Sequence, residues 1–218
     1  MRLPSKTLEK KLFSQGYKKI IAIDEVGMGS LAGPVVVCAV SFDKKFFKKR
    51  HRNLSRLRDS KLLLPHQREK FVTELLKERN FTYKTSFCFP KTIDRINIYQ
   101  AARLAMRRAI RRLHNANIRM YANTANKKVM TLIDGPSKIK GLELKQLPVV
   151  KGDRKIFSIA CASLIAKVFR DKMMIRYSKR FPKYGFEKHK GYGTKFHRVM
   201  LLKLGRSPIH RNSFSFRT

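Results

Sequence analysis

Four acidic residues of this chain occupy positions where a reaction could be catalysed. The sequence of 218 residues contains 14 Asp and Glu against 51 Lys and Arg, so the position of each acid is informative. Asp24 and Glu25 end one apolar run, Asp134 ends a second, and Asp153 follows a third. Functional groups of open α/β sheets gather at the carboxyl ends of the strands. The spacing therefore favours one cluster of four carboxylates at an edge of a sheet.

Such a cluster has a defined chemistry. Four neighbouring carboxylates repel one another unless cations neutralise them. An all-oxygen set of ligands suits Mg²⁺ or Mn²⁺, and two such ions about 4 Å apart can drive in-line hydrolysis of a phosphodiester. One ion would lower the pKa of a bound water to make the nucleophile, and the other would stabilise the leaving 3′ oxygen. No protein nucleophile is then needed, in keeping with a sequence that has no HExxH or GxSxG motif.

A second interpretation of the same acids stays open. A lone Asp after a strand commonly serves as a helix N-cap or a turn former, and spacing alone does not establish that the four residues meet. Other acids, including Glu9, Asp43 and Glu69, lie in polar contexts and are expected to be solvated.

The charge of the chain indicates the class of partner. A formal net charge of +37 and a pI near 10.9 predict an extended polyanion, most simply nucleic acid. Charge alone does not separate an enzyme from a binding protein. Apolar runs fall short of the roughly 18 residues that span a bilayer, so no membrane partner is expected. The three dispersed cysteines, Cys38, Cys88 and Cys161, favour a reduced, cytoplasmic interior over a disulfide scaffold.

Apolar runs and helical periodicity predict the elements that would position these acids. Strands and helices interleave, which is typical of an α/β domain with a partly parallel sheet. No composition break divides the chain, so we predict a single domain over residues 1–218, with residues 1–17 as a short basic N-terminal extension. The predicted strands span residues 18–24, 35–40, 81–89 and 128–134, and the predicted helices span 65–79, 98–114, 157–180 and 194–204.

The histidines receive a less specific interpretation. His66, His189, His197 and His210 show no metal-ligand spacing. They are expected to be turn residues or phosphate contacts.

Seven motifs, in a fixed order, make the chain resemble ribonuclease HII, the bacterial and archaeal type 2 ribonuclease H. They cover almost the whole chain from about Ile20 onward, and so many separate matches in register are specific. The motifs are AIDEVGMGSLAGPVVVCAV at 22–40, DSKLL at 59–63, LIDG at 132–135, VVKGD at 149–153, SIACASLIAKVFRD at 158–171, YGFEKHKGYGT at 184–194 and SPIHRNSF at 207–214.

The resemblance implies a fold, a reaction and a set of ligands. The fold would be ribonuclease H-like, a mixed five-stranded sheet flanked by helices. The enzyme would be an endonuclease that cuts on the 5′ side of a ribonucleotide, in RNA–DNA hybrids and in duplex DNA with embedded ribonucleotides. Products would carry a 3′-hydroxyl and a 5′-phosphate. By analogy, Mg²⁺ or Mn²⁺ would be bound by Asp24, Glu25, Asp134 and Asp153, the same acids that the strand ends single out.

The resemblance also implies how substrate is recognised. The family uses the backbone of a Gly-Arg-Gly turn, together with the Tyr of a KGY motif, to sense the ribonucleotide and its junction with DNA. Here the turn is Gly27-Met28-Gly29 and the Tyr is Tyr192, so the central Arg is missing. Recognition through the backbone is expected to persist, whereas the junction preference is left open. Basic residues within matching motifs are candidate phosphate contacts: Lys61, Lys151, Lys167, Lys190 and Arg211.

Two functions from different classes follow. The first is a monomeric, cytoplasmic, metal-dependent endoribonuclease. The second is a non-catalytic, basic nucleic-acid-binding protein that keeps the same fold. The intact acids argue for the enzyme, and Met28 in place of Arg leaves room for the binding protein.

Overall fold

A mixed five-stranded sheet forms the centre of the protein. The computed structural model describes residues 3–49, 51, 54, 63–121 and 128–215. The strands lie in the order β3-β2-β1-β4-β5, with β1–β2 and β2–β3 antiparallel and with β1–β4 and β4–β5 parallel. The sheet predicted from the resemblance is therefore confirmed. The strands are β1 (Lys19–Val26), β2 (Val35–Asp43), β3 (Phe81–Cys88), β4 (Val129–Asp134) and β5 (Lys145–Val149).

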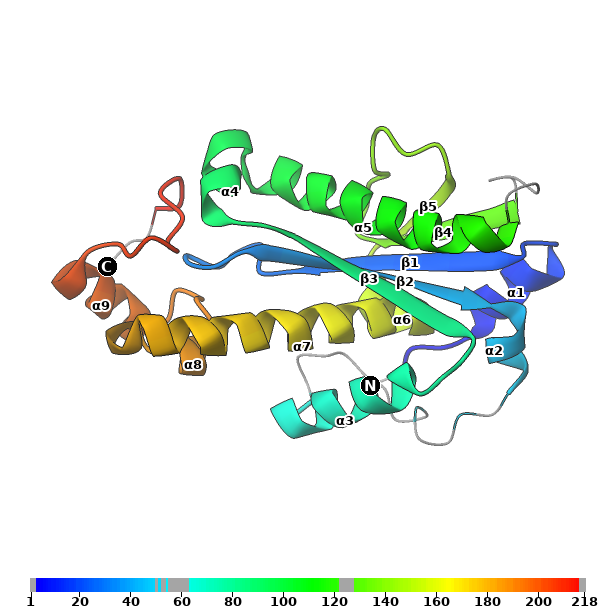
Figure 1. Ribbon diagram of the computed structural model, residues 1–218, viewed down its shortest axis with the longest axis horizontal. Helices are drawn as coiled ribbons and strands as arrows, with labels where there is room; N and C mark the ends of the chain where they lie inside the picture. The colour runs from blue at the N-terminus through cyan, green and yellow to red at the C-terminus, as the bar shows by residue number, and fades with distance from the viewer. Residues whose placement is uncertain (1–2, 50, 52–53, 55–62, 122–127, 216–218) are drawn as a thin grey trace.

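Helices cover both faces of the sheet, which gives a three-layer arrangement (Figure 1). The long helix α5 (Ile98–Tyr121) lies on one face, and α7 (Phe157–Arg180) lies on the other, with α3 (Pro65–Leu76) beside it. The shorter helices are α1 (Thr7–Ser14), α2 (Lys44–Lys48), α4 (Pro90–Ile96), α6 (Gly152–Lys155), α8 (Phe186–His189), α9 (Lys195–Leu204) and the 3₁₀ helix η4 (Pro182–Tyr184).

Strand β1 is buried on both faces because each face borders its own hydrophobic core. Ile20 and Ala22 join the core beneath α7, whereas Ile21 and Ile23 join the core beneath α5. Residues of a strand point alternately to opposite faces, so a strand covered on both sides is apolar along its length. The helical stripe predicted on α5 is confirmed as buried: Ala102, Ala105, Met106, Ala109, Ile110 and Leu113.

The longest predicted elements agree best with the structure. The helix predicted over residues 157–180 matches α7, and the one predicted over 98–114 extends to Tyr121 in α5. Strand β5 was not predicted. It is short, lies at the edge of the sheet and contains Pro148, a residue that edge strands tolerate but central strands do not.

The segment expected to be an N-terminal extension contributes to the core. Leu12 and Phe13 of α1 are buried against it. Glu9, which we expected to be solvated, is fully buried, and its Oε1 accepts a hydrogen bond of 2.9 Å from the N–H of Ser158. Ser158 lies in the first turn of α7, where backbone N–H groups lack partners within the helix. Glu9 thus caps α7 from another helix, and burial raises the pKa of its carboxyl.

Replacing this cap is expected to destabilise the fold. Glu9→Ala should lower the free energy of unfolding by about 1–3 kcal/mol, because a buried N–H of α7 loses its acceptor. Urea unfolding of the variant measures the change. Glu69→Ala is the matched control, since the side chain of Glu69 is 55% exposed. Equal losses in the two variants would contradict the capping role.

Candidate active site

Asp24 and Asp134 lie side by side at the carboxyl ends of two parallel strands. The register pairs Ile23 of β1 with Ile133 of β4, so the next residue on each strand is the acid. Asp24 is almost completely buried, at 4% exposure. Burial, followed by the nearby carboxylates of Glu25 and Asp134, raises the pKa of Asp24 well above its ordinary value. The smaller contribution, from Glu25 and Asp134, is the repulsion expected of neighbouring carboxylates.

Backbone hydrogen bonds hold Asp153 next to Asp134. Oδ1 of Asp134 accepts from the N–H of Gly152 at 2.6 Å and from the N–H of Asp153 at 3.4 Å. These contacts hold the first turn of α6 over the end of β4. Lys151, the residue before α6, is exposed and has a left-handed backbone with φ of 56°. Asp153 therefore lies next to Asp134.

The pleat of β1 separates the two consecutive acids. Asp24 follows the alternation of Ile20 and Ala22, which places it on the α7 face, where the hydroxyl of Ser163 hydrogen-bonds to it. Glu25 comes next and takes the opposite alternation. Within the residues that the structure describes, no group of three or more His, Cys, Asp or Glu side chains is arranged to hold a metal ion. The acids lie as neighbouring pairs. Their carboxylate oxygens are the ligand atoms that Mg²⁺ and Mn²⁺ prefer.

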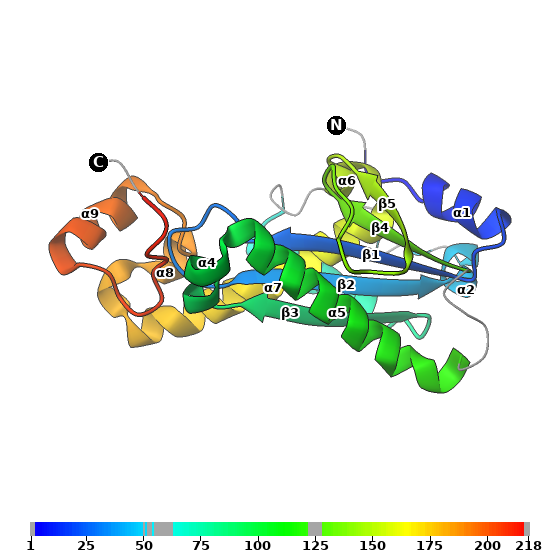
Figure 2. The same cartoon turned by 90° about the horizontal axis from the view of Figure 1, so that it is seen from above.

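The two segments predicted to recognise the ribonucleotide are neighbours. A bridge joins Ser30, directly after the turn Gly27–Gly29, to Tyr192, and the N–H of Leu31 donates to the carbonyl of Gly191 at 2.9 Å. The arrowhead of β1 points toward the end of the molecule that holds α8 and α9 (Figure 2). Tyr192 is partly exposed, at 36%, and can therefore meet a ligand. Met28, between the two glycines of the turn, packs against the core beneath α5.

Basic side chains surround Tyr192. The guanidinium carbon of Arg170 lies 5.5 Å from the centre of its ring, and Nζ of Lys167 lies 5.9 Å from it. Lys167 also pairs with Asp171, with 2.8 Å between Nζ and Oδ1, and Arg68 pairs with the other oxygen of Asp171 at 3.4 Å. Lys167 and Arg68 therefore approach one carboxylate from two helices. The sequence did not single out Arg68 or Asp171, although Lys167 and Asp171 have the i, i+4 spacing of a helical ion pair.

The remaining candidate phosphate contacts have different environments. Lys190 is partly buried, and burial lowers its pKa, while its ammonium donates to the carbonyl of Glu187. The exposed ammonium of Lys151 is open to a phosphate. Lys61 lies outside the described residues.

The structure contradicts the role that we predicted for Arg211. We predicted a phosphate contact, but the side chain is fully buried. Its guanidinium donates to the carbonyls of Gly27, Met28 and Gly33 at 2.6, 2.8 and 3.1 Å. In this structure Arg211 binds the turn from inside and does not reach the surface. The sequence could not show this, because one Arg among 51 basic residues has no feature that marks it as buried.

A buried chain of hydrogen bonds through two histidines supports the backbone of Tyr192. The N–H of Ser207 donates to Nδ1 of His210 at 2.8 Å, so the proton of a neutral His210 ring lies on Nε2. Nε2 of His210 lies 3.0 Å from Nε2 of His197, and Nδ1 of His197 donates to the carbonyl of Tyr192 at 2.9 Å. The ring of His189 stacks on His197 with 4.3 Å between centres. These histidines have structural roles: the N–H of His210 closes a turn onto the carbonyl of Ser207, in keeping with the expected turn role, while the burial of His197 and His210 keeps their rings away from a phosphate.

The two bonded histidines predict a loss of stability in mild acid. Burial is the main reason that the pKa values of His197 and His210 fall to about 4 from 6.5. An unfolded chain takes up these protons near pH 6.5, whereas the native protein resists them. Stability is therefore complete above pH 6.5 and is lost as the pH falls toward 4, by about 1.4 kcal/mol per pH unit for each histidine.

Urea unfolding between pH 7 and 5 measures this slope. His210→Gln, which removes one titrating ring, should flatten the slope relative to wild type by about 1.4 kcal/mol per pH unit. His66→Gln is the control because His66 is exposed. Identical slopes in the two variants would show that His210 is not kept neutral by its burial.

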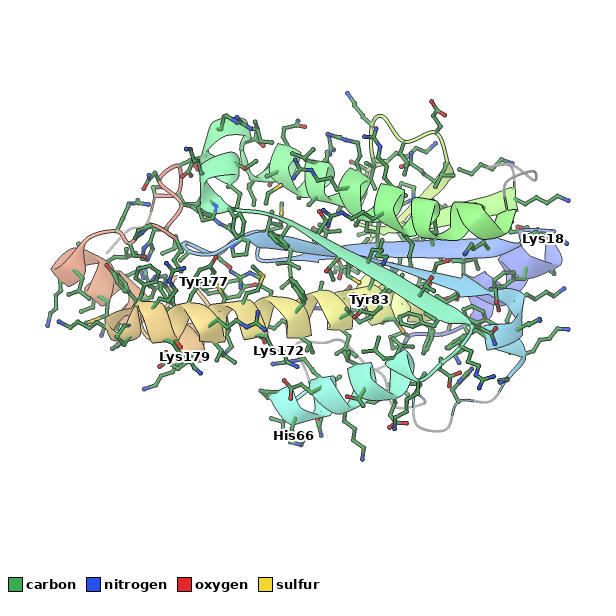
Figure 3. The ribbon with its side chains drawn as sticks, in the orientation of Figure 1. Lys18, His66, Tyr83, Lys172, Tyr177 and Lys179 are labelled. Carbon is green, nitrogen blue, oxygen red and sulfur yellow. The ribbon has the colours of Figure 1, made fainter. Side chains whose placement is uncertain are left out.

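Positive charge is spread along the molecule. Lys18, beside β1 at one end, and Lys172 and Lys179 on α7 all extend into solvent (Figure 3). On α5, Arg108, Arg111 and Arg112 are also exposed, apart from a hydrogen bond of 3.3 Å from Arg112 to the carbonyl of Thr85. A polyanion can therefore contact the protein over a wide area. Among the helices of the described residues, each is too short or too polar to cross a membrane.

Comparison with solved structures defines the class of fold. The ribonuclease HII of the PCNA:RNase HII complex from Archaeoglobus fulgidus matches with a TM-score of 0.69 at 24% identity, over 91% of this chain and 96% of that chain. Bst-RNase HIII in complex with Mn²⁺ matches with a TM-score of 0.61 at 18% identity, over 78% of this chain and 57% of that chain. The protein has the ribonuclease H-like fold of the type 2 enzymes.

Sequence comparison then gives the family. The model of the family described as Ribonuclease HII matches residues 21–217. The ribonuclease HII of Caldicellulosiruptor bescii is 44% identical over 207 residues, covering 95% of this chain and 91% of its own length. The chain belongs to the ribonuclease HII family of endoribonucleases, which act on RNA paired with DNA.

Proposed function

We propose that this protein cuts the phosphodiester on the 5′ side of ribonucleotides, both in RNA–DNA hybrids and at single ribonucleotides embedded in duplex DNA. The products carry a 3′-hydroxyl and a 5′-phosphate. The protein works as a cytoplasmic monomer, with one catalytic domain over residues 1–218. The observation that carries the proposal is the adjacency of Asp24 and Asp134 at the ends of parallel strands, with Asp153 beside them, in a chain of this family.

The four acids would hold the metal. Asp24, Glu25, Asp134 and Asp153 offer carboxylate oxygens, and a Mn²⁺ complex is known for a protein of the same fold. Two ions of Mg²⁺ or Mn²⁺ would supply an activated water and stabilise the leaving 3′ oxygen. Burial is the main cause of the raised pKa of Asp24, and the neighbouring carboxylates of Glu25 and Asp134 add to it; a cation among these carboxylates would relieve their repulsion, which supports the assignment.

The other residues of the site orient the substrate. The backbone of Gly27–Gly29 would contact the 2′-hydroxyl of the ribonucleotide, and the exposed edge of Tyr192 would pack on the next sugar. Lys167 and Lys190 lie near Tyr192, and Lys151 precedes α6 beside Asp153; these lysines would bind phosphates. Since Met28 is uncharged and packs inward, any phosphate contact that the family's Arg side chain makes would be absent here, and recognition would rest on the backbone of the turn.

Cleavage of three labelled duplexes tests this function. The duplexes are DNA with one ribonucleotide, an RNA–DNA hybrid, and all-DNA, each incubated with Mg²⁺, with Mn²⁺ or with EDTA. We expect metal-dependent cleavage of the first two and an intact third. Binding of all three without cleavage in either metal would overturn the proposal and favour a non-catalytic binding protein.

A further inference from the structure

Two fully buried arginines lie beneath the recognition turn. Arg170 of α7 and Arg211 near the C-terminus are both 0% exposed. Burial, and after it the nearby positive charge of Arg170, lowers the pKa of Arg211. The hydrogen bonds of both guanidiniums end on backbone carbonyl oxygens. A buried charge is costly unless its donors are satisfied, so two such groups at one place call for an explanation.

Arg211 fixes the direction of the peptide groups in the turn. It holds the carbonyls of Gly27 and Met28 inward. In a planar trans peptide, the N–H points away from the C=O of the same unit. The N–H groups of Met28 and Gly29, which belong to these two peptide units, therefore point away from Arg211. Successive N–H groups directed to the same side form a concave site for anionic or hydroxyl oxygens.

Arg170 joins this turn to the segment that carries Tyr192. Its guanidinium donates to the carbonyls of Ala32 and Pro34 at 3.0 Å each, and to the carbonyl of Lys190 at 2.8 Å. The same side chain passes against Gly27, where a Cβ would overlap its Nε. Arg170 thus contacts the turn, the loop after it and the Tyr192 segment together.

We propose that Arg170 and Arg211 are positioning residues for ribonucleotide recognition. They hold the N–H groups of the turn and the ring of Tyr192 at a fixed separation, so that both meet one ribonucleotide and the sugar that follows. This inference rests on the proposed function, which assigns the turn and Tyr192 to the substrate. The guanidiniums also place two positive charges beneath a site that lies along a phosphate backbone.

This role needs the several N–H donors of a planar guanidinium, and not positive charge alone. Lysine keeps the positive charge but has one compact ammonium, which cannot span three carbonyls in the geometry of a planar guanidinium. Arg211→Lys and Arg170→Lys therefore test the geometry at constant net charge. Arg176→Lys is the matched control, since Arg176 lies on α7 and is exposed.

The experiment compares equilibrium binding of two duplexes in EDTA, which differ only in one ribonucleotide. Wild type and Arg176→Lys should prefer the duplex with the ribonucleotide. Arg211→Lys should lose roughly 10- to 100-fold of that preference, the equivalent of one or two charge-assisted hydrogen bonds, while its affinity for all-DNA is unchanged. Arg170→Lys should also lose part of the preference for the duplex with the ribonucleotide, because Tyr192 is no longer held in place. Adding Tyr192→Ala to Arg170→Lys should then reduce that preference little further.

The outcomes separate this inference from the proposed function. Circular dichroism and thermal unfolding first establish that each variant is folded. If Arg211→Lys does not fold, Arg170→Lys, which reaches the turn from α7, decides. Full preference retained in a folded variant, or equal loss of affinity for both duplexes, overturns the positioning role. Absence of preference in wild type overturns it as well. The proposed function fails by a different result, the lack of metal-dependent cleavage.

Discussion

Asp134→Asn is expected to reduce cleavage by roughly a thousandfold or more while duplex binding is retained or tightened. The amide keeps an oxygen that can accept from the N–H groups of Gly152 and Asp153, so the fold around α6 should survive. The change removes one carboxylate from the proposed metal ligands, and metal-dependent stabilisation of the reaction is lost with it. It also removes a negative charge that faces phosphate, which should favour binding.

Single-turnover cleavage and binding to the same duplex measure the two effects. Asp43→Asn is the matched control. Asp43 also accepts hydrogen bonds from backbone N–H groups, at the start of α2. It lies far from Asp24, since in the sheet register it is opposite Lys19, the first residue of β1. The control should cleave normally. Substantial cleavage by Asp134→Asn would remove Asp134 from the set of metal ligands.

Gly191→Ala has the second largest expected effect. Gly191 has φ of +84°, and a Cβ there would overlap the carbonyl oxygen of Ala32, which is backbone and cannot rotate away. The variant must separate the Tyr192 segment from the loop after the turn. We expect a loss of about 3 kcal/mol or more in stability, because steric overlap adds to the cost of a left-handed backbone. Cleavage should fall as well, since Tyr192 moves.

Gly205→Ala isolates the backbone cost from the overlap. Gly205 has φ of +73°, and a Cβ there meets nothing within 4 Å. With ψ of −167°, this backbone conformation is one that only Gly adopts readily, so the variant should cost about 1–3 kcal/mol and leave cleavage unchanged. Thermal unfolding and cleavage rates of both variants supply the comparison. Equal losses of stability would show that the contact between Gly191 and Ala32 is not tight.

The places of Asp24 and Asp134 in the sheet could be predicted because they depend on local pattern, whereas their role as metal ligands stays a prediction. Asp134 ends β4 and Asp24 lies two residues before the end of β1, and the parallel register of the two strands places these acids side by side. Four of the strands and the long helices were predicted for the same reason, since burial on one or both faces leaves a signal in the sequence, whereas the five-stranded sheet was predicted from the family resemblance. Asp153 was singled out by the short apolar run before it and by its motif, but the hydrogen bonds that hold it next to Asp134 leave no signal in the sequence.

Residues whose roles arise from tertiary packing were beyond prediction. Glu9 lies in a helix that looks solvated, yet it caps a helix that begins almost 150 residues later. Arg211 resembles any other basic residue until three carbonyls are placed around it. The bond between His197 and His210 joins two segments that only the fold brings together. The sequence thus supplies the candidate catalytic residues, whereas the structure shows the contacts around the proposed substrate-recognition segments.

Mapping the cut in a DNA duplex with one ribonucleotide tests the central claim most directly. Each strand is end-labelled, and the products of a Mg²⁺ or Mn²⁺ reaction are separated at single-nucleotide resolution beside markers of known ends. We predict one break, on the 5′ side of the ribonucleotide, with a 3′-hydroxyl on one fragment and a 5′-phosphate on the other. A break on the 3′ side, breaks in the all-DNA strand, or no break in either metal would contradict the proposed function.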